Sequence, residues 1–507
     1  MTENDLLWLP ARELVELQRR REVSAREILD AHLAQIDAVN PKVNAIITLA
    51  EDRARELAAR ADAAAARGEL LGPLHGLPVA HKDLAPTKGI RTTYGSPLYA
   101  DHVPDHDALV VEQLVHAGAV TVGKTNVPEF GAGIQSTNEL FGPTRNPYDL
   151  SLTAGGSSGG AAAAVATGMV ALADGGDTGG SLRNPATFCN VVGLRPSVGS
   201  VPMWPAKDPF APLSIQGPLG RTVDDVALQM AVLTRADPRS PWGLGDPSRF
   251  HAGLEGDFSD VPVAWSPDLG GQLAVDDAVR TAMDPVPGAL AGISRKVGVA
   301  APDMTGADEA FRTLRGWYRA LNYGDRYAAN PEVFGIRVRQ DIENGLATTS
   351  AGLMRAHKLR GLLFQRFVEF TREYRYLVTV TTQVLPWSAE QLWPERIGHT
   401  RSENYLDCMR SMYWFTVLGV PALSVPAGFT ADGLPVGVQI VGRSGDDLGV
   451  LRLARQIERT LGAGLRRPAV ALPVTGAGSD GARVTGGGTD SGARIIGAST
   501  DGARVTG

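Results

Sequence analysis

The stretch that decides the fold reads GGSSGG over Gly155–Gly160 and is followed by GGDTGGSLRNP over Gly175–Pro185. A third motif, LPVAHKD, lies upstream at Leu77–Asp83. Glycines permit the tight turns in which a backbone exposes a serine hydroxyl and directs several N–H groups at one anion. One serine in each glycine turn, together with the lysine of the upstream motif, indicates acyl transfer that does not use histidine.

The serine of the second turn has the surroundings that a nucleophile needs. A serine hydroxyl reacts poorly until a base takes its proton, and the oxyanion that its attack creates needs preorganised N–H donors. Two glycines directly precede Ser181, so the chain can curl into a nest of amides around the attacked carbonyl. The sequence therefore predicts Ser181 as the nucleophile, with an oxyanion hole built from Thr178, Gly179 and Gly180.

The base of this reaction is predicted to be Lys82, which ends an apolar run. Burial disfavours the ammonium form, so a desolvated lysine can be neutral near physiological pH and accept a proton. Ser157 then relays the proton between Lys82 and Ser181. The alternative for this lysine is an ordinary ion pair with its neighbour Asp83.

Length and composition limit the class of protein. The chain has 507 residues, of which 43% are hydrophobic and 21% charged, and its formal net charge is −6. These values are typical of a large globular enzyme and not of a protein that binds nucleic acid. The two cysteines, Cys189 and Cys408, lack a metal-binding spacing, the first residues are acidic, and no apolar run of about 18 residues occurs. We expect a cytoplasmic protein with no membrane partner.

Periodicity predicts alternating helices and strands, which is typical of an α/β fold. Ser24 and Glu27 have the spacing of a capping box at the start of an amphipathic helix. The other expected helices cover residues 51–67, 110–116, 161–168 and 448–461, and the expected strands cover 77–80, 119–123, 422–428 and 433–442.

The chain divides into three parts by composition. Residues 1–70 are expected to form a helical flank on the core, and residues 71–470 the catalytic domain, in which about 202–375 supply loops and peripheral helices around the substrate pocket. Residues 474–507 carry three imperfect copies of a short Gly-Ala-Arg repeat. Such a segment buries little apolar surface, so we expect disorder, with a short solenoid or a separate binding module as the alternatives.

The motifs together resemble the amidase signature family over about residues 5–465. The resemblance is carried by the segments Gly76–Asp83, Gly123–Phe130, Gly155–Gly160, Asp177–Pro185 and Gly433–Gln439. It implies a single large α/β domain, in which a mixed central β-sheet is surrounded by helices. It also implies hydrolysis of a carbon–nitrogen bond through an acyl-enzyme, without a metal or an organic cofactor.

The resemblance assigns the same three residues to a Ser–cis-Ser–Lys triad. Ser181 is the nucleophile, Ser157 the bridging serine after a cis peptide bond, and Lys82 the base. It implies that Asp177 and Arg183 brace the loop of the oxyanion hole, and Ser158 is expected to be a structural hydroxyl.

The expected substrate is a small amide with a hydrophobic or aryl group, and the family also cleaves anilides, esters and carbamates (urethanes). An apolar and aromatic set of side chains near the Ser181 turn favours such a molecule. The predicted substrate-binding residues are Ile134, Gln135, Gly155, Gly156, Met203 and Trp204, with Trp387 or Tyr413 as further candidates. A homodimer is the assembly considered.

Two residues depart from the common family pattern. His81 stands where an apolar residue usually precedes the lysine, and Gly176 where Thr or Ser is usual. Successive side chains of a strand point to opposite faces, so His81 is expected to point away from Lys82. We interpret it as a hydrogen-bonded core histidine. The alternative is that His81 tunes the pH dependence of the site.

Two other functions stay open. GGSSG at Gly155–Gly159 also fits G-x-S-x-G, so a Ser-His-Asp α/β-hydrolase with Ser157 as nucleophile is an alternative, with His251, His357 or His399 as its histidine. The second alternative is the amidase subunit of a tRNA-dependent amidotransferase complex.

The segment Asp101–Asp107 is dense in metal-ligand residues, but Pro104 separates its two histidines, so we interpret it as a solvated loop.

Overall fold

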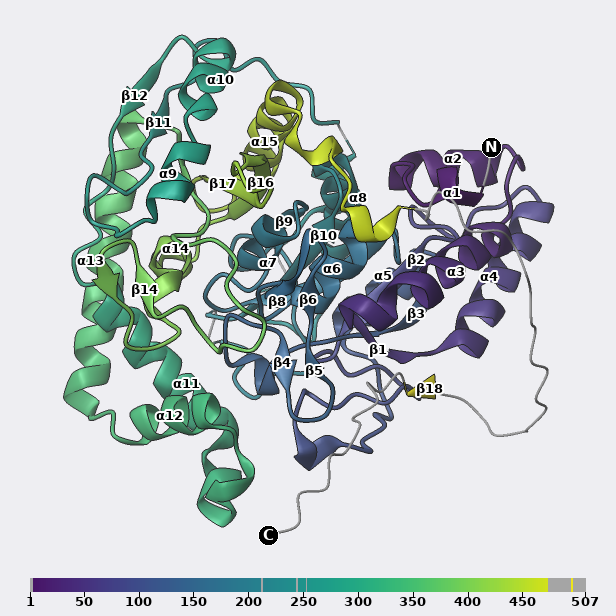
Figure 1. The fold of residues 1–507 in the computed structure, drawn as a ribbon, viewed down its shortest axis with the longest axis horizontal. Coiled ribbons are helices and arrows are strands. Elements are labelled where there is room, and N and C mark those ends of the chain that lie inside the picture. Colours follow the sequence, from purple (N-terminus) through teal and green to yellow (C-terminus); the bar gives the residue numbers. More distant parts are fainter. Residues whose placement is uncertain (1–2, 211–212, 243–244, 252, 473–493, 496–507) are drawn as a thin grey trace.

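A large mixed β-sheet forms the centre of the protein, and helices surround it (Figure 1). The structure is a computed structural model that describes residues 3–210, 213–242, 245–251, 253–472 and 494–495. The strands follow one another across the sheet in the order β12 (Val297–Val299), β11 (Val263–Trp265), β13 (Tyr376–Val380), β17 (Pro435–Val441), β16 (Ala422–Phe429), β9 (Val192–Arg195), β10 (Ile215–Gly220), β8 (Leu172–Asp177), β2 (Pro78–Lys82), β3 (Val120–Thr125), β1 (Ile46–Leu49) and β18 (Arg494–Ile495).

The sheet mixes parallel and antiparallel pairs. β2 pairs in parallel with both β8 and β3, and β11 pairs in parallel with β12 and β13. The remaining pairs of neighbouring strands are antiparallel. Three short hairpins lie outside the sheet: β4 (Thr137–Asn138) with β5 (Gly142–Pro143), β6 (Arg145–Asn146) with β7 (Asp149–Thr153), and β14 (Arg396–Ile397) with β15 (Thr400–Arg401).

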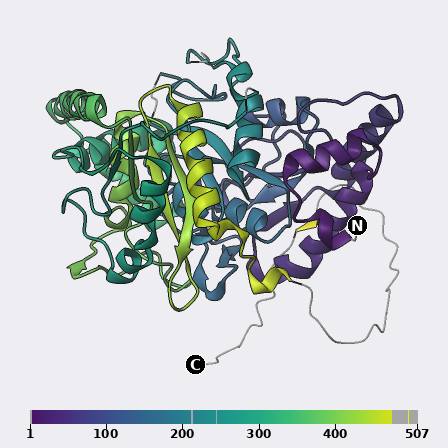
Figure 2. The same ribbon diagram turned by 90° about the horizontal axis from the view of Figure 1, so that it is seen from above.

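Helices from all parts of the chain cover the sheet (Figures 1 and 2). The first third contributes α1 (Glu3–Leu6), α2 (Ala11–Arg19), α3 (Ala25–Val43), α4 (Glu51–Ala66), α5 (Leu109–His116) and α6 (Gly159–Ala166). The middle contributes α7 (Arg183–Phe188), α8 (Val223–Leu233), α9 (Asp277–Ala282), α10 (Pro285–Ile293), α11 (Ala307–Ala329), α12 (Ile336–Leu346) and α13 (Ser350–Glu373). The end contributes α14 (Arg410–Leu418) and α15 (Asp447–Leu461).

Several predicted elements are confirmed. Ser24 accepts a hydrogen bond from the Glu27 backbone, and the Glu27 carboxylate accepts one from the Ser24 backbone, which completes the capping box of α3. The predicted strands near the end of the chain are β16 and β17, which pair antiparallel. The small residues of α6 are all buried, and the helix contacts β8, β10, β2 and β3.

Four strands of the described sheet were predicted, β2, β3, β16 and β17, and the other eight were not. β10 lies between β9 and β8 at the centre of the sheet, although its region was expected to hold only loops and peripheral helices. Its sequence, IQGPLG, contains two glycines and a proline, which are rare in strands. Gly217 is needed there, because a Cβ would lie 2.4 Å from the Leu194 carbonyl oxygen. β1 likewise adds a strand to the flank that was expected to be helical.

The predicted disordered tail lies mostly outside the described residues. Its described part is β18, which pairs antiparallel with β1.

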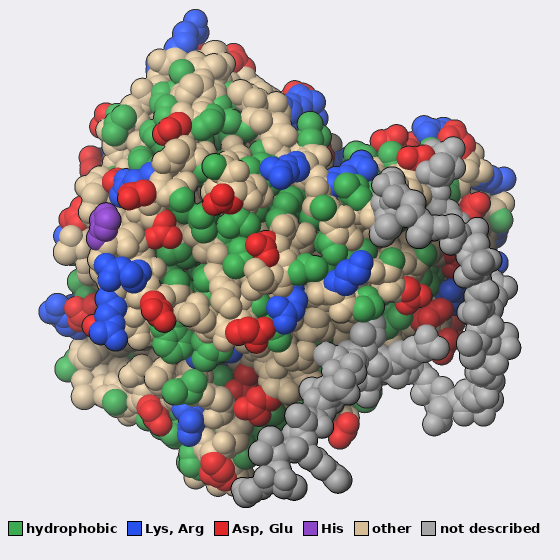
Figure 3. All heavy atoms as spheres, viewed as in Figure 1, with side chains coloured by type: hydrophobic (Ala, Val, Ile, Leu, Met, Phe, Trp, Pro, Cys, Tyr) green, Lys and Arg blue, Asp and Glu red, His purple; other side chains and the backbone are tan. Residues whose placement is uncertain are grey.

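Within the described ranges, no helix combines the length and the apolar character that crossing a membrane requires. On the described part of the face in Figure 3, acidic and basic side chains are interspersed, in keeping with the small net charge of −6.

Candidate active site

Lys82 ends β2 and lies in the interior, with 3% of its surface exposed. Because β2 and β8 are parallel neighbours, their carboxyl ends meet at the same edge of the sheet. There the Lys82 ammonium nitrogen, Nζ, donates to Ser157 Oγ at 2.8 Å, Ser158 Oγ at 2.7 Å and the Gly176 carbonyl at 3.2 Å. All three acceptors are uncharged.

The alternative ion pair of Lys82 with Asp83 is wrong. The Asp83 carboxylate accepts from the backbone and the hydroxyl of Thr93, at 3.0 and 2.5 Å. The charge of Lys124 lowers the pKa of Asp83, although burial is the larger effect and raises it to about 6. In the described part of the chain, Lys82 has no carboxylate within salt-bridge distance.

Burial lowers the pKa of Lys82 to about 7. The carboxylates of Asp177 and Asp174 act in the opposite direction, and the guanidinium of Arg319 lowers the pKa further. A lysine with this pKa is partly neutral at physiological pH, so it can accept a proton.

The first glycine turn carries Ser157 after a cis peptide bond between Gly156 and Ser157. Asn184 fixes this turn, because its side-chain oxygen accepts from the Gly156 amide at 2.9 Å. The Ser158 amide donates to the Ser181 carbonyl at 3.2 Å, which joins the two serine turns. The structure thus brings Lys82, Ser157 and Ser158 into direct contact and places Ser181 in the adjoining turn.

Ser158 and Gly176 have contacts that the sequence did not indicate. Ser158 shares the Lys82 amine with Ser157, although it was expected to be only a structural hydroxyl. Gly176 presents its carbonyl to the same amine, and a Cβ there would meet only the Ile215 carbonyl, at 3.7 Å.

The second glycine turn is held by Asp177 and Arg183, which are both buried. Asp177 accepts from the amides of Gly180 at 2.8 Å and Leu182 at 3.2 Å. Arg183 donates to both oxygens of Asp177, each at 3.0 Å. Burial raises the pKa of Asp177, but the charges of Arg183 and Arg195 outweigh it and hold the pKa at about 2.

The amides around Ser181 divide into two groups. The Gly180 amide donates to Asp177, so it is not available to a substrate as was expected. In the described residues, the amides of Thr178, Gly179 and Ser181 donate to no protein acceptor. Neighbouring N–H groups without a partner form a suitable site for a developing oxyanion.

An apolar wall packs against this turn. A Cβ on Gly179 would lie 3.0 Å from the Phe311 ring and 3.4 Å from the Met409 methyl group, and one on Gly180 would lie 2.5 Å from the Met412 sulfur. Tyr413, a predicted candidate, stacks on Phe311 with ring centroids 4.2 Å apart. Phe311 comes from α11, far from the motifs in sequence, so no local pattern could have indicated it.

The other predicted substrate-binding residues lie in different places. The Ile134–Gln135 segment packs on the first turn, since a Cβ on Gly156 would lie 2.9 Å from Gln135 and 3.0 Å from Ile134. Gly155 belongs to the same turn, and its carbonyl accepts from the Ser136 amide. Met203 lines a small pocket of about 40 Å³ with Ser214, whose hydroxyl bonds to Thr178.

Two predicted aromatic residues have other partners. Trp204 packs edge-on to His106 and under the Arg239 guanidinium, which lies 4.8 Å from its ring. The Trp387 ring packs against Phe188. The prediction relied on aromatic character, which does not reveal which surface an aromatic ring covers.

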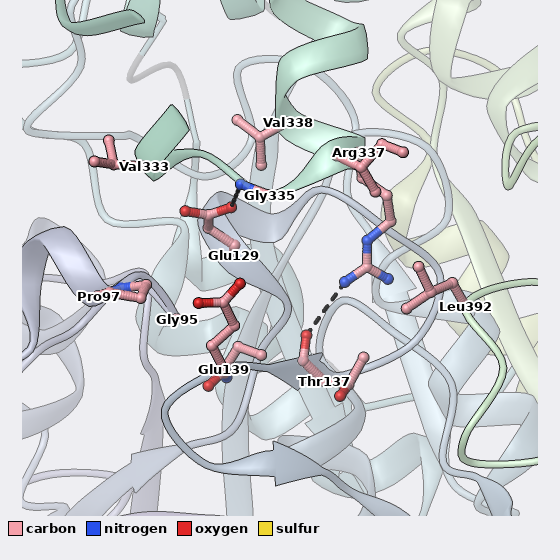
Figure 4. A pocket seen from close by; sticks show the side chains of 12 residues that line it. Gly95, Pro97, Glu129, Thr137, Glu139, Val333, Gly335, Arg337, Val338 and Leu392 are labelled. Carbon is pink, nitrogen blue, oxygen red and sulfur yellow. Dashed lines mark hydrogen bonds between the residues drawn. The ribbon is translucent and has the colours of Figure 1, made fainter. Parts of the chain in front are cut away.

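A larger pocket of about 300 Å³ adjoins the segment that precedes Ile134 (Figure 4). Glu129 lies on one side, where it accepts from the Gly335 amide at 2.8 Å, and Arg337 lies on the other, where it donates to the Thr137 carbonyl at 3.2 Å. Apolar side chains complete the wall, among them Val333, Val338 and Leu392. No motif in the sequence indicated this pocket.

Gly131 links this segment to the first turn and is expected to tolerate no side chain. Its φ is +71°, and an added Cβ would lie 2.9 Å from the Leu84 side chain and 3.4 Å from Ser157 Oγ. Gly131→Ala should lower kcat/KM by at least about tenfold, because the Cβ clashes with Leu84 next to the bridging serine and must displace the segment. Gly142→Ala is the control, since Gly142 has a similar φ of +73° but open space around it. Equal losses of kcat/KM in the two variants would contradict this reasoning.

The histidines proposed for a Ser-His-Asp triad lie elsewhere. His251, His357 and His399 are all exposed, whereas Ser157 is buried. The segment Asp101–Asp107 forms a loop, as predicted, with a surface pair between Asp105 and His106 at 2.7 Å. In the described ranges, no group of three or more potential ligand side chains is placed to hold a metal.

Comparison with known proteins agrees with this geometry. A family model described as Amidase matches residues 27–451. An acylamidase of Rhodococcus erythropolis is 35% identical over 482 residues, which cover 94% of this chain and 100% of the relative. A glutamyl-tRNA(Gln) amidotransferase subunit of Anaeromyxobacter dehalogenans is 37% identical over 492 residues, which cover 89% and 98%. The crystal structure of a bacterial aryl acylamidase superposes with a TM-score of 0.85 at 26% identity, covering 92% of this chain and 98% of that one. The chain therefore belongs to the amidase signature family, whose members are hydrolases of carbon–nitrogen bonds.

Proposed function

We propose that this protein hydrolyses the carbon–nitrogen bond of a hydrophobic or aryl amide, through an acyl-enzyme on Ser181. The observation that carries the proposal is the state of Lys82. Its amine is buried, has no carboxylate partner among the described residues, and lies 2.8 Å from Ser157 Oγ. A lysine in these surroundings is suited to remove a proton from a hydroxyl.

The proposed reaction begins with proton transfer through the two serines. Neutral Lys82 accepts the Ser157 proton, Ser157 accepts the Ser181 proton, and Ser181 Oγ attacks the carbonyl carbon. The free amides of Thr178, Gly179 and Ser181 stabilise the oxyanion. As the carbon–nitrogen bond breaks, the proton returns through Ser157 to the leaving amine, and water then hydrolyses the acyl-enzyme by the same route.

The proposed substrate class rests on the wall beside the oxyanion amides. Phe311, Met409 and Met412 are apolar and pack on Gly179 and Gly180. Apolar walls with a few convergent polar groups are typical of sites for hydrophobic small molecules. The names of the two acylamidases agree with this class, and an anilide, ester or carbamate would pass through the same tetrahedral intermediate.

The amidotransferase subunit remains the second candidate, because relatives with that name are as similar as the acylamidase. The two functions differ in what the isolated chain can do. We expect the purified chain to hydrolyse acetanilide-type amides without a partner. Release of ammonia from glutamine, together with no turnover of anilides, aliphatic amides or carbamates, would favour the second candidate.

Covalent labelling tests the nucleophile directly. A fluorophosphonate reacts with an activated serine and leaves a fixed mass increase on one peptide. We expect that increase on Ser181, its loss in Ser181→Ala, and its retention when His251, His357 and His399 are each replaced by alanine. Labelling of Ser157 in the wild type, or loss of labelling in any of the histidine variants, would overturn the assignment.

Both cysteines, Cys189 and Cys408, are free and buried, which fits the cytoplasmic location that we propose.

A further inference from the structure

His81 and Asp174 form a buried pair directly beside Lys82. The His81 ring nitrogen Nδ1 lies 2.5 Å from Asp174 Oδ2, and its Nε2 lies 3.0 Å from the Thr121 hydroxyl. The other oxygen of Asp174 accepts the backbone N–H of Lys82 at 3.0 Å. His81 belongs to β2, Asp174 to β8 and Thr121 to β3, so the pair crosses three neighbouring strands.

The hydrogen bonds assign the proton on the histidine ring. A carboxylate can only accept, so Nδ1 of His81 donates to Asp174. Nε2 is then free to accept from the Thr121 hydroxyl. This arrangement holds Asp174 in one orientation, and Asp174 in turn holds the main chain of the lysine.

We propose that Asp174, oriented by His81, is a positioning residue for the Lys82 base: it fixes the lysine main chain, and its negative charge acts on the amine from beyond salt-bridge distance. This inference rests on the proposed function, because it requires Lys82 to accept the Ser157 proton. The ammonium formed in that step is stabilised by a nearby carboxylate. The bonds from His81 and from the Lys82 backbone each occupy one oxygen of Asp174 and hold the carboxylate in place.

Other charges act on the same groups. Asp177, at the end of β8, and Asp174 both raise the pKa of Lys82, whereas Arg319 of α11 lowers it. Asp174 also raises the pKa of Lys124 on β3. Asp177 pairs with two cations, Arg183 and Arg195, which offset its charge. Asp174 pairs only with the His81 ring among the described residues, so its charge is less compensated.

The pH dependence of kcat/KM tests this role. Asp174→Asn keeps the shape of the side chain but removes its charge, so the pKa of Lys82 should fall and the acid limb should move to lower pH, by about one unit. On the plateau, kcat should fall by about 10- to 100-fold with KM nearly unchanged, because substrate does not touch this residue.

Variants of His81 extend the test. His81→Leu should move the acid limb in the same direction, since Asp174 then loses the donor that orients its charge. His81→Asn keeps a donor near the position of Nδ1 and should restore most of the wild-type profile. The double variant His81→Leu/Asp174→Asn should be no slower than Asp174→Asn alone, because both changes act through the same carboxylate.

His32→Leu is the matched control. His32 is also a fully buried histidine, and its Nδ1 contacts the Gly168 carbonyl at 2.8 Å. Its loss should destabilise the fold without moving the acid limb. An Nδ1 proton resonance of His81 at low field, present in Lys82→Met and absent in Asp174→Asn, provides a readout that needs no activity.

The outcomes distinguish failure of the positioning role from failure of the proposed function. If Lys82→Met is inactive but Asp174→Asn keeps the wild-type acid limb, the positioning role is overturned and the proposed function stands. If Lys82→Met stays active, the proposed function itself fails. If His32→Leu moves the limb as much as His81→Leu, the shift reflects lost stability and the positioning role is overturned.

Discussion

Replacement of Lys82 by methionine should lower kcat/KM by about 10⁴-fold. Methionine fills similar space but cannot accept a proton, so Ser157 and Ser181 would keep their protons. The lysine lies within 2.8 Å of both Ser157 Oγ and Ser158 Oγ, and among the described residues no other base contacts either hydroxyl. Steady-state hydrolysis of an anilide would measure the loss, and a variant that keeps more than a tenth of wild-type activity would contradict the proposed base.

The wild-type enzyme should lose activity as the pH falls through about 7. Burial lowers the pKa of Lys82 to about 7, and only the neutral amine can act as a base. Activity should therefore rise with pH through this value and level off above it. Lys124→Met is the control, because Lys124 is also buried but bonds to the Thr87 hydroxyl and the Ala85 carbonyl. That variant should be less stable and keep the wild-type acid limb.

Replacement of Arg183 by methionine should cost about 3–5 kcal/mol of unfolding free energy. Arg183 is fully buried and donates to both oxygens of Asp177, and also to Gln439 and the Met412 carbonyl. Its loss leaves the Asp177 carboxylate buried with one remaining cation, Arg195. Urea denaturation would measure the change, and a loss below about 1 kcal/mol would contradict this account.

Arg239→Met provides the surface comparison for Arg183. Arg239 pairs with Glu112 and Asp237, but the arginine side chain is 35% exposed. An exposed pair contributes about 0–1 kcal/mol, so this variant should remain close to the wild type in unfolding free energy.

Acid should weaken the fold through Asp177. Its pKa in the folded protein is about 2, below the ordinary value of 3.8. A carboxylate with a lowered pKa contributes stability that is complete above its ordinary value and is lost as the pH falls toward its folded value. The contribution is about 2 kcal/mol. In Arg183→Met this part of the acid dependence should shrink, which denaturation curves between about pH 5 and pH 2 would show.

The elements predicted best are those with a local signal. The capping box of α3 and the alternation of β16 and β17 are readable from a few neighbouring residues. β10 could not be found in this way, because its glycines and proline disfavour a strand. It is a strand because it pairs with β8 on one side and β9 on the other, and the close approach of Leu194 then requires glycine at position 217. Both are properties of the assembled sheet.

In the site, too, the residues with a local sequence signal were predicted and those brought together only by the fold were not. The motifs identified Lys82 and Ser157, whose contact depends on short, recognisable turns. They did not identify Asp174 as the partner of His81, because 93 residues separate the two and only the pairing of β2 with β8 brings them together. The use of the Gly180 amide by Asp177 was also hidden, since the turn decides which N–H groups face the carboxylate.

The sheet order has a consequence for how the protein is made. β9 ends at Arg195, yet its neighbour β16 begins only at Ala422, and Arg183 of the serine turn bonds to Gln439. A ribosome must therefore release almost the whole polypeptide before the catalytic turn can close. Until then, the nascent chain exposes a strand edge that can pair with another chain. We therefore expect incomplete chains, formed during slow synthesis or by early termination, to aggregate most readily.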